Sequence, residues 1–459
     1  MPSTTTVNPT TEEDLETYPH MSTGELGEAI AASQEAFERW RRRPIEERAE
    51  IVGRLAGVLG DHEQPLSELM SQEMGKPIRQ GPAEVQLCAS ICEYTAEHGP
   101  QQLADRDESK KGGRALVTFQ PTGIIYGIQP WNFPMYQVIR YATPQLVAGN
   151  TVLLKHAANV WGMAKRLAEL MREAGVPQGV FTPLFIDHDQ SDAVIEDRRV
   201  RGVTFTGSAS AGSIVASKAA GALKKTVLEL GSNDAYLVLA DADVELAAKA
   251  CAQGRIFNNG ETCVAAKRFI VAKAVYAEFR ERFVERMKAV QMGDPMQKDT
   301  KLGPMARKDL RDDLHDQVRA SVDKGAKVLV GGERPERRGW FYPATVLDDV
   351  TAGQPAYDDE LFGPVASLIQ VDDDDEAVRV ANDSRFGLGG GIFSKDVDRA
   401  VEIARTRLDT GMVNVNGYNL AQPHLPFGGV KDSGYGREHG GFGIHEFVNA
   451  KAVVIDERS

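Results

Sequence analysis

Alternating strand and helix patterns over residues 123–240 constrain the fold of this chain more than any other feature. Apolar runs typical of strands lie at 124–128, 151–155, 180–186, 202–206, 225–230 and 235–240, and helical periodicity covers about 135–148, 160–174 and 208–219. Strands connected through helices form a parallel sheet covered on both faces, and such sheets bind ligands at the carboxyl ends of their strands. The chain is therefore expected to be an α/β protein.

The rest of the chain is expected to cover this sheet and to build a second α/β unit. With 459 residues the chain is long enough for two or more domains. Residues 22–104 have helical periodicity and need a sheet to lie on. In the second unit, residues 241–425, we expect strands at 268–272, 326–331, 365–371, 390–393 and 411–415 and a long charged helical region at about 274–325. The glycine-rich residues 426–451 are expected to fold back toward the active site.

Cys263 is the first candidate for chemistry, because small and polar residues precede it in FNNGET at 257–262. A nucleophilic cysteine needs room for a substrate and backbone N–H groups that can hold an oxyanion. A lone free cysteine is more often a small buried hydrophobe, which is our interpretation of Cys88 and Cys92. Glu229 ends an apolar strand just before a turn, and Asn132 lies in the turn QPWNFP at 129–134. A thiol, a carboxylate and an amide suit acyl transfer through a thioester, as nucleophile, general base and oxyanion donor.

Motifs spread over nearly the whole chain give these residues a family context. They are PWNFP at 130–134, FTGS at 205–208, ELG at 229–231, GETC at 260–263, ELFGP at 360–364 and PFGG at 426–429. In this order they resemble NAD(P)-dependent aldehyde dehydrogenases, and KHA at 155–157 with the compact length is most similar to the succinate-semialdehyde dehydrogenases. The resemblance implies that Cys263, Glu229 and Asn132 are catalytic. It also implies that a small-molecule aldehyde is oxidised to the carboxylate through a cysteine thiohemiacetal and thioester.

The same resemblance implies a division of the chain into three parts. A Rossmann-type cofactor-binding domain would comprise residues 1–104 and 123–231, and an α/β catalytic domain residues 232–443, including the C-terminal return segment. Residues 105–122 and 444–459 would supply a small β ribbon for oligomerisation. Within it, a strand at 115–120 is expected to pair with the tail at 452–456. This ribbon implies a homodimer or a homotetramer.

The resemblance further implies NAD or NADP as the cofactor. The residues that it places at the cofactor are Trp131, Lys155, Ala158, Gly207, Ser208, Gly212, Leu230, Glu360 and Phe362. From the residues alone, Gly207 and Ser208 are equally typical of an ordinary glycine turn with a serine N-cap, and Lys155 of a solubilising charge. Many NAD-preferring relatives carry a glutamate where this chain has Ala158. A carboxylate there would repel a 2′-phosphate, so the preference between NAD and NADP stays open.

Arg140 is the candidate for substrate specificity. It follows Asn132 on the next expected helix, where a guanidinium can bind the distal carboxylate of a small ω-carboxy aldehyde such as succinate semialdehyde. Succinate-semialdehyde dehydrogenases resemble this chain at that position, although Phe257 stands where some of them have a second arginine. An ordinary surface arginine is the alternative. The function would then be oxidation of neutral aliphatic or aromatic aldehydes, or none on a catalytically silent scaffold.

Two residues depart from the family pattern. Glu261 stands where most relatives have glutamine, and a carboxylate so near Cys263 disfavours the thiolate unless it points away. Ser232 replaces a common glycine and constrains the loop after Glu229. Both are expected to tune the rate without removing a catalytic group.

Charge and composition argue against several other classes of function. The net charge of −13 argues against nucleic acid as a partner, and the acidic run at 372–376 is expected to be a solvated turn before a helix. The cysteines show no metal-ligand spacing, so no metal is expected. No stretch approaches ~18 uninterrupted apolar residues and the N-terminus lacks a signal-peptide pattern, so no membrane association is expected. Only four cysteines suit a reducing, cytoplasmic compartment.

Overall fold

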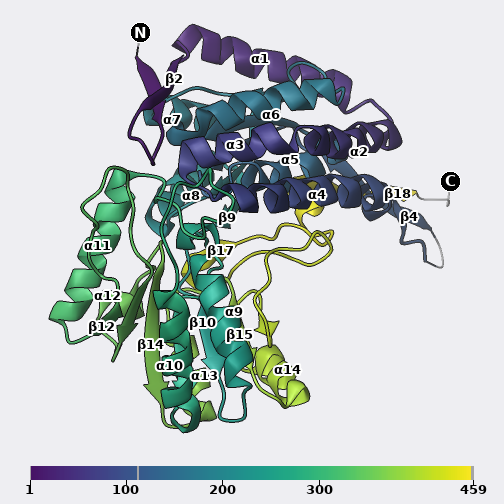
Figure 1. Ribbon diagram of the computed structural model, residues 1–459. Coiled ribbons are helices and arrows are strands. Elements are labelled where there is room, and N and C mark those ends of the chain that lie inside the picture. Colours follow the sequence, from purple (N-terminus) through teal and green to yellow (C-terminus); the bar gives the residue numbers. More distant parts are fainter. Residues whose placement is uncertain (1, 111–112, 456–459) are drawn as a thin grey trace.

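The computed structural model describes residues 2–110 and 113–455, which form two lobes, each built around its own sheet (Figure 1). The first sheet has the strand order β17-β9-β8-β5-β6-β7. Its strands are β5 (Ile124–Gln129), β6 (Thr151–His156), β7 (Phe181–Pro183), β8 (Val200–Thr206), β9 (Lys225–Glu229) and β17 (Gly434–Tyr435). The strands from β5 to β9 are parallel, as expected, whereas β17 pairs antiparallel with β9.

Three sequence-based expectations for this sheet are corrected by the structure. The strand expected at 180–186 is only β7, Phe181–Pro183, at the sheet edge, where a proline without an N–H is tolerated. The strand expected at 235–240 becomes β10 (Ala235–Val238), which lies in the second sheet because the chain crosses between lobes after β9. The two-residue strand β17 was not expected, since a glycine-rich segment carries no strand periodicity.

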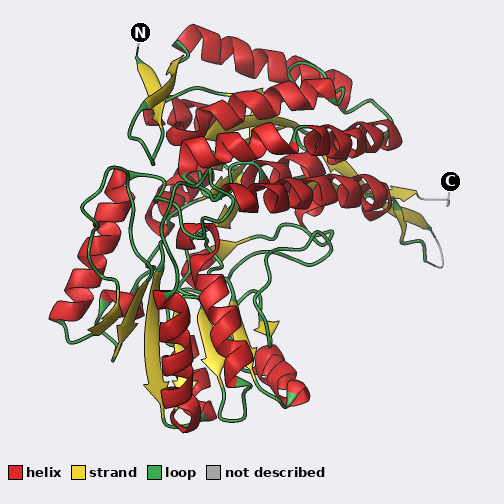
Figure 2. Ribbon diagram, in the orientation of Figure 1, coloured by secondary structure: helices red, strands yellow, loops and turns green. Residues whose placement is uncertain are grey.

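Helices cover both faces of the first sheet. Val152 and Leu154 of β6 belong to one buried cluster and Leu153 to another, as the alternation of side chains along a strand requires. The helices and helical turns of this lobe are α1 (Thr23–Trp40), α2 (Ile45–Asp61), α3 (Glu63–Met74), η1 (Ile78–Gln80), α4 (Gly81–Gln102), α5 (Tyr136–Ala148), η2 (Ala158–Val160), α6 (Trp161–Glu173), α7 (His188–Glu196) and α8 (Ala209–Gly221). Figure 2 shows these helices gathered in the upper lobe, where they hide much of the sheet.

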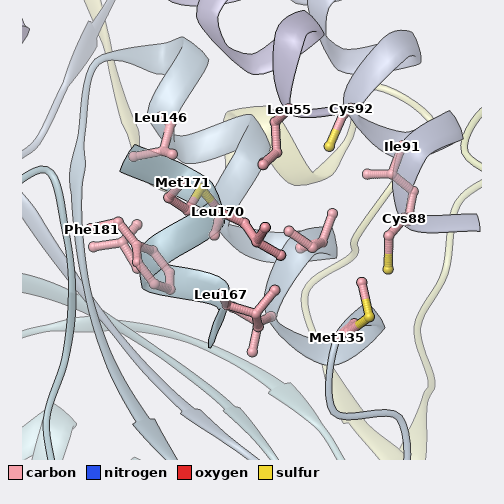
Figure 3. Packing of buried hydrophobic residues seen from close by; sticks show 14 of the residues in the cluster. Leu55, Cys88, Ile91, Cys92, Met135, Leu146, Leu167, Leu170, Met171 and Phe181 are labelled. Carbon is pink, nitrogen blue, oxygen red and sulfur yellow. The ribbon is translucent and has the colours of Figure 1, made fainter. Parts of the chain in front are cut away.

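Cys88 and Cys92 lie in the larger of these two clusters. Both side chains of α4 are fully buried, with Leu55 and Met135 in the same cluster (Figure 3). Their interpretation as core residues is therefore confirmed.

The second sheet has the strand order β12-β13-β14-β11-β10-β15-β16. Its other strands are β11 (Arg268–Ala272), β12 (Lys327–Val330), β13 (Thr345–Asp348), β14 (Val365–Val371), β15 (Gly390–Phe393) and β16 (Asn414–Val415). Around it lie α9 (Val244–Ile256), η3 (Phe257–Gly260), α10 (Lys273–Lys288), α11 (Lys308–Asp323), α12 (Pro355–Asp358), α13 (Asp374–Asn382) and α14 (Val397–Thr406). The single helical region expected at 274–325 was wrong, because a loop separates α10 from α11, and β13 was not expected. The acidic run at 372–376 was expected as a turn before a helix, but only Asp372 and Asp373 precede α13. Asp373 is the N-cap, and the other three acidic residues form the first turn of the helix.

A three-stranded ribbon projects from the first lobe, with the order β18-β4-β3. Its strands are β3 (Arg106–Asp107), β4 (Arg114–Pro121) and β18 (Val448–Ile455). The predicted pairing is confirmed, with Ala452 opposite Val117, while Asp456 of the predicted strand and residues 111–112 of the turn before β4 lie outside the described residues. An N-terminal hairpin, β1 (Ser3–Val7) and β2 (Asp14–Pro19), was not expected.

The return segment joins the second lobe back to the first through η4 (Lys431–Ser433), β17 and η5 (Gly443–His445). The Leu230 N–H donates to the Ser433 carbonyl at 3.0 Å, and the Ser433 hydroxyl donates to the Gly231 carbonyl at 2.8 Å. This segment therefore holds the turn after β9. The domain boundaries stay a prediction, with β17 an exception to the division at residue 231. Within the described ranges, no helix is both long and apolar enough to cross a membrane.

Candidate active site

A cavity of about 360 Å³ is lined by residues of both lobes. Asn132 and Glu229 of the first lobe line it together with Cys263 of the second. The predicted cofactor residues in its lining are Trp131, Gly207, Ser208, Leu230, Glu360 and Phe362. Those outside the lining are Lys155, Ala158 and Gly212. The volume lies in the range of small-molecule sites, so three chemically distinct groups share one ligand-sized space.

The loop that carries Cys263 turns sharply because three successive residues have a left-handed backbone. Their φ angles are 52° at Asn258, 57° at Asn259 and 76° at Gly260. Asparagine and glycine tolerate this region better than other residues. A Cβ at Gly260 would lie 2.4 Å from the carbonyl carbon of Gly363, so only glycine fits there. The residue types before the thiol are thus explained by the turn that presents it.

Hydrogen bonds hold Asn132 against this loop. Asn258 Nδ2 donates to the Asn132 carbonyl at 2.8 Å, and Asn132 Nδ2 donates to the Glu261 carbonyl at 3.1 Å. Gln137 Nε2 donates to Asn132 Oδ1 at 3.3 Å, which sets the orientation of the amide. Because a carboxamide nitrogen carries two hydrogens, one remains for an oxyanion in the cavity.

Glu229 ends β9 with a side chain that is buried and lines the cavity. Neither carboxylate oxygen has a hydrogen-bond partner among the described residues. Burial raises the pKa of Glu229 well above its ordinary value, and Arg140 opposes this shift. A Cβ at Gly428 would lie 2.8 Å from Glu229 Oε1, so a glycine of the return segment lets the chain pass close to the carboxylate. A buried, unpartnered carboxylate of raised pKa is suited to act as a general base on water.

The Cys263 thiol lies in a mixed electrostatic environment. Burial raises the pKa of Cys263 to about 12, and the carboxylates of Glu360 and Glu229 also raise it. The cations of Arg140 and Lys267 lower the pKa of this thiol. The thiolate therefore depends on these two buried cations.

Arg140 is buried and has a carboxylate partner within the chain. Its Nε lies 2.5 Å from Glu438 Oε2, and its Nη2 donates to Thr206 Oγ1 at 2.8 Å. The guanidinium carbon lies 5.2 Å from the ring centroid of Tyr136 and 5.0 Å from that of Phe427. Its Nη1 has no hydrogen-bond partner among the described residues. The alternative of an ordinary surface arginine is thus wrong. Arg140 is not among the residues that line the cavity, and its binding of a substrate carboxylate stays a prediction.

The two departures from the family pattern each find a partner. Glu261 Oε1 accepts a hydrogen bond from the Ala306 N–H at 3.0 Å, and burial raises the pKa of this carboxyl well above its usual range. Its neutral form is therefore favoured, which weakens any repulsion of the thiolate. The Ser232 hydroxyl donates to Asp234 Oδ1 and accepts from the Leu388 N–H at 3.3 Å.

Three of the residues predicted to hold a dinucleotide, Gly207, Ser208 and Gly212, lie at the start of α8. Ser208 is the N-cap, with Oγ accepting from the Ala211 N–H at 3.3 Å, so the serine-cap interpretation holds. A Cβ at Gly212 would lie 2.5 Å from Leu230 Cδ2, so this glycine allows close packing beside the cavity. Free N–H groups and the positive end of a helix dipole fit a diphosphate.

The rings of Trp131 and Phe362 meet edge to face at the same cavity, with centroids 5.8 Å apart. Lys155 is the next-to-last residue of β6 and is largely buried, and burial lowers its pKa while Asp187 raises it. Ala158 begins the turn η2. The structure thus places Lys155 and Ala158 together, apart from the chemical groups around Cys263.

Sequence reasoning missed three side chains that shape the site: Gln137, Lys267 and Glu438. Gln137 lines the cavity and orients Asn132. Lys267 and Glu438 are buried ionic groups that form ion pairs with Glu360 and Arg140, respectively. Helical spacing signals Gln137 only weakly, and a lysine before a strand or a glutamate in a glycine-rich segment is ordinarily solvated. No signal in the sequence distinguishes them.

Comparison with known proteins gives concordant results. The model of the aldehyde dehydrogenase family matches residues 2–453. The chain is 44% identical over 450 residues to the Escherichia coli (strain K12) succinate semialdehyde dehydrogenase [NAD(P)+] Sad. The matched region covers 98% of this chain and 97% of that protein. It is 46% identical over 448 residues to a Deinococcus radiodurans succinate-semialdehyde dehydrogenase [NADP(+)], with 98% and 94% covered.

A solved structure has the same fold over its full length. Succinic semialdehyde dehydrogenase from Streptococcus pyogenes in complex with NADP+ has a TM-score of 0.96 and 37% identity, covering 99% of this chain and 100% of that one.

Proposed function

The chain belongs to the aldehyde dehydrogenase family, and from this premise we propose that it oxidises an aldehyde to a carboxylate with NAD or NADP. The observation that carries the proposal is the convergence of Asn132, Glu229 and Cys263 on one cavity, beside Glu360 and the N-terminus of α8. A second function has no comparable observation in its favour.

Each catalytic side chain has a separate task in this reaction. The Cys263 thiolate attacks the carbonyl carbon, and the Asn132 amide with the Cys263 backbone N–H holds the resulting oxyanion. A bound nicotinamide would supply the acceptor for the hydride of the thiohemiacetal carbon. Loss of that hydride would leave a thioester on Cys263. Glu229 then takes a proton from water, which attacks the thioester and releases the acid and the free thiol.

For the cofactor, Glu360 is proposed to accept from the nicotinamide-ribose hydroxyls, and Lys155 to contact the adenosine ribose. The two relatives are named for NAD(P)+ and NADP(+), and Ala158 places no carboxylate against a 2′-phosphate. We therefore infer that both nucleotides bind. Their relative affinity follows from titrating each one separately.

For the substrate, we infer succinate semialdehyde or a similar small ω-carboxy aldehyde. The named relatives act on succinate semialdehyde. Arg140 does not itself line the cavity, but its Nη2 donates to Thr206 Oγ1, and Thr206 does line it. Its Nη1, which has no hydrogen-bond partner among the described residues, is proposed as the donor for a substrate carboxylate. Glu438 neutralises part of this charge. One free donor and a partly compensated cation suit an anion of small size.

The test is reduction of NAD and NADP with succinate semialdehyde and with hexanal, in the native protein and in Arg140→Met. A lost charge-assisted hydrogen bond of ~1.5–3 kcal/mol raises KM for the semialdehyde about tenfold or more. Hexanal should respond far less. An equal effect on both aldehydes refutes the carboxylate role. Because Arg140→Met leaves Glu438 without its cation, the double variant with Glu438→Gln is the matched control for folding.

Assembly and compartment are proposed from the ribbon and from composition. The β18 edge exposes Val453 and Val454, the latter 76% accessible, and β18 has β4 as its strand partner within the chain. We infer that β18 contributes to a homodimer or homotetramer, and that the protein works in the cytoplasm. Light scattering of the native protein, compared with a Val454→Lys variant, tests the assembly.

A further inference from the structure

Lys267 is a buried lysine whose ammonium contacts the backbone of the nucleophile, Cys263. It precedes β11, and its side chain is 2% exposed. Its N–H donates to the Asp234 carbonyl at 3.3 Å, and its own carbonyl accepts from the Ser367 N–H at 3.0 Å. The backbone of Lys267 is thus fixed between strands of the second sheet. A buried ammonium is costly unless it is paired and hydrogen-bonded, so its contacts indicate its role.

The ammonium of Lys267 joins two parts of the active site. Its Nζ donates to the Cys263 carbonyl at 2.5 Å and lies 3.0 Å from Glu360 Oε1. The same carboxylate oxygen accepts from the Ser232 N–H at 3.1 Å. Glu360 lines the cavity, whereas Lys267 reaches it only through these partners. One cation therefore bridges the peptide of the nucleophile and the carboxylate on the cofactor side.

The position of Glu360 is tightly defined on its other side. A Cβ at Gly231 would lie 2.2 Å from Glu360 Oε2, so a larger residue there would displace the carboxylate. Glu360 is consequently confined between Gly231, the Ser232 N–H and Lys267. Any group that draws this carboxylate toward the cavity must weaken its contact with the ammonium.

The charges around the thiol give the bridge a chemical consequence. Glu360 raises the pKa of Cys263 and Lys267 lowers it, while Arg140 lowers it and Glu229 raises it. Lys267 also lowers the pKa of the buried Asp234, and two buried phenols, Tyr136 and Tyr418, lie within electrostatic reach of the thiol. Lys267 contacts both Glu360 and the Cys263 peptide. A change in the hydrogen bonding of the Glu360 carboxylate therefore alters the electrostatic environment of the Cys263 sulfur.

We propose that Lys267 is a positioning residue that links occupation of Glu360 by the cofactor to the alignment and reactivity of Cys263. The inference rests on the proposed function, because it takes Glu360 as the acceptor of the nicotinamide-ribose hydroxyls. A hydroxyl that donates to Glu360 competes with Lys267 for the same carboxylate. The ammonium is then freer to bind the Cys263 carbonyl and to stabilise the thiolate. By linkage, a change at Cys263 alters cofactor affinity to the same extent.

The experiment measures the rate at which iodoacetamide alkylates Cys263 as a function of pH, with and without saturating NAD or NADP. Cys88, Cys92 and Cys251 are buried, and a Cys263→Ala variant supplies the background. Cofactor binding is titrated separately through tryptophan fluorescence, since Trp131 lines the cavity. Neither readout requires turnover or knowledge of the aldehyde. The variants are Lys267→Met, which removes the charge, and Lys267→Arg, which keeps it.

In the native protein, saturating cofactor should raise the alkylation rate about fivefold or more, the lower end of ordinary coupling between sites. In Lys267→Met the apparent pKa of alkylation should rise, and the cofactor effect should fall below about twofold. Lys267→Arg should restore part of both. An unchanged pH profile and cofactor effect in Lys267→Met, with nucleotide still bound, refutes the inference alone.

Two further arms keep the test decisive. If Lys267→Met does not fold, Glu360→Gln removes the carboxylate and keeps the cation. This variant should lower the apparent pKa of alkylation and abolish the cofactor effect, and an intact effect overturns the inference. If neither nucleotide binds to the native protein, the proposed function fails and the inference fails with it.

Discussion

Replacement of Asn132 by alanine isolates the oxyanion-stabilising part of the site. One hydrogen of Asn132 Nδ2 is committed to the Glu261 carbonyl at 3.1 Å, and the other is available to the substrate oxygen. Loss of one oxyanion donor typically lowers kcat by about 10²–10³, or ~2.7–4 kcal/mol. Loss of the structural hydrogen bonds costs a further ~0.5–1.5 kcal/mol each in stability, not in rate. The two effects are therefore separable by measurement.

The assay combines steady-state kinetics, thermal unfolding and cofactor titration on the same preparations. Asn132→Ala should reduce kcat for every aldehyde by a similar factor and leave nucleotide affinity within the error of the native value. Gln137→Met is the matched control, because it removes only the hydrogen bond of 3.3 Å that orients the amide. Its loss of kcat should be smaller. A folded Asn132→Ala protein that retains native kcat would refute the assignment of this amide to the oxyanion.

Two further predictions concern pH and backbone geometry. Burial raises the pKa of Cys263 to about 12 and also raises the pKa of Glu229. Because the deprotonated form of each group increases as pH rises, kcat/KM should increase from neutral to alkaline pH. A flat pH profile would argue against both roles. Gly260→Ala forces a Cβ to within 2.4 Å of the Gly363 carbonyl carbon at a φ of 76°. The free energy of unfolding should therefore fall by at least ~1 kcal/mol, which thermal unfolding would show as a lower Tm. Gly57→Ala is its control, since a Cβ there meets nothing within 4 Å inside α2, and a comparable loss in that variant would contradict the strain argument.

Much of the fold follows from local patterns in the sequence. Strands β11 and β14 match the expected ranges because each is a short, mostly apolar run, RFIVA and VASLIQV, which is typical of a buried strand. The hairpin of β1 and β2 escaped prediction, since both strands are polar and β2 is largely solvent-exposed. Strand β17 depends on a partner, β9, that is distant in sequence. Such contacts are set by tertiary packing and leave no periodic trace.

The residues of the active site also divide into those that the sequence predicts and those that depend on tertiary contacts. Cys263, Glu229 and Asn132 could be singled out because each interrupts an apolar or turn context with a reactive group. Arg140 was placed on the correct helix, but its ion pair with Glu438 joins segments far apart in the chain and could not be foreseen. The same holds for Lys267, whose contact with Glu360 requires the folded sheet.

The most direct measurement of the central claim is the mass of the Glu229→Gln protein after mixing with NADP and succinate semialdehyde. Without the base that activates water, the thioester on Cys263 should accumulate. Intact-protein mass spectrometry should then show one acyl group per chain, absent when Cys263→Ala is added to the variant. A rapid burst of reduced cofactor should accompany it. Full turnover without a burst or adduct, or an adduct that persists in Cys263→Ala, would contradict the shared roles of these residues.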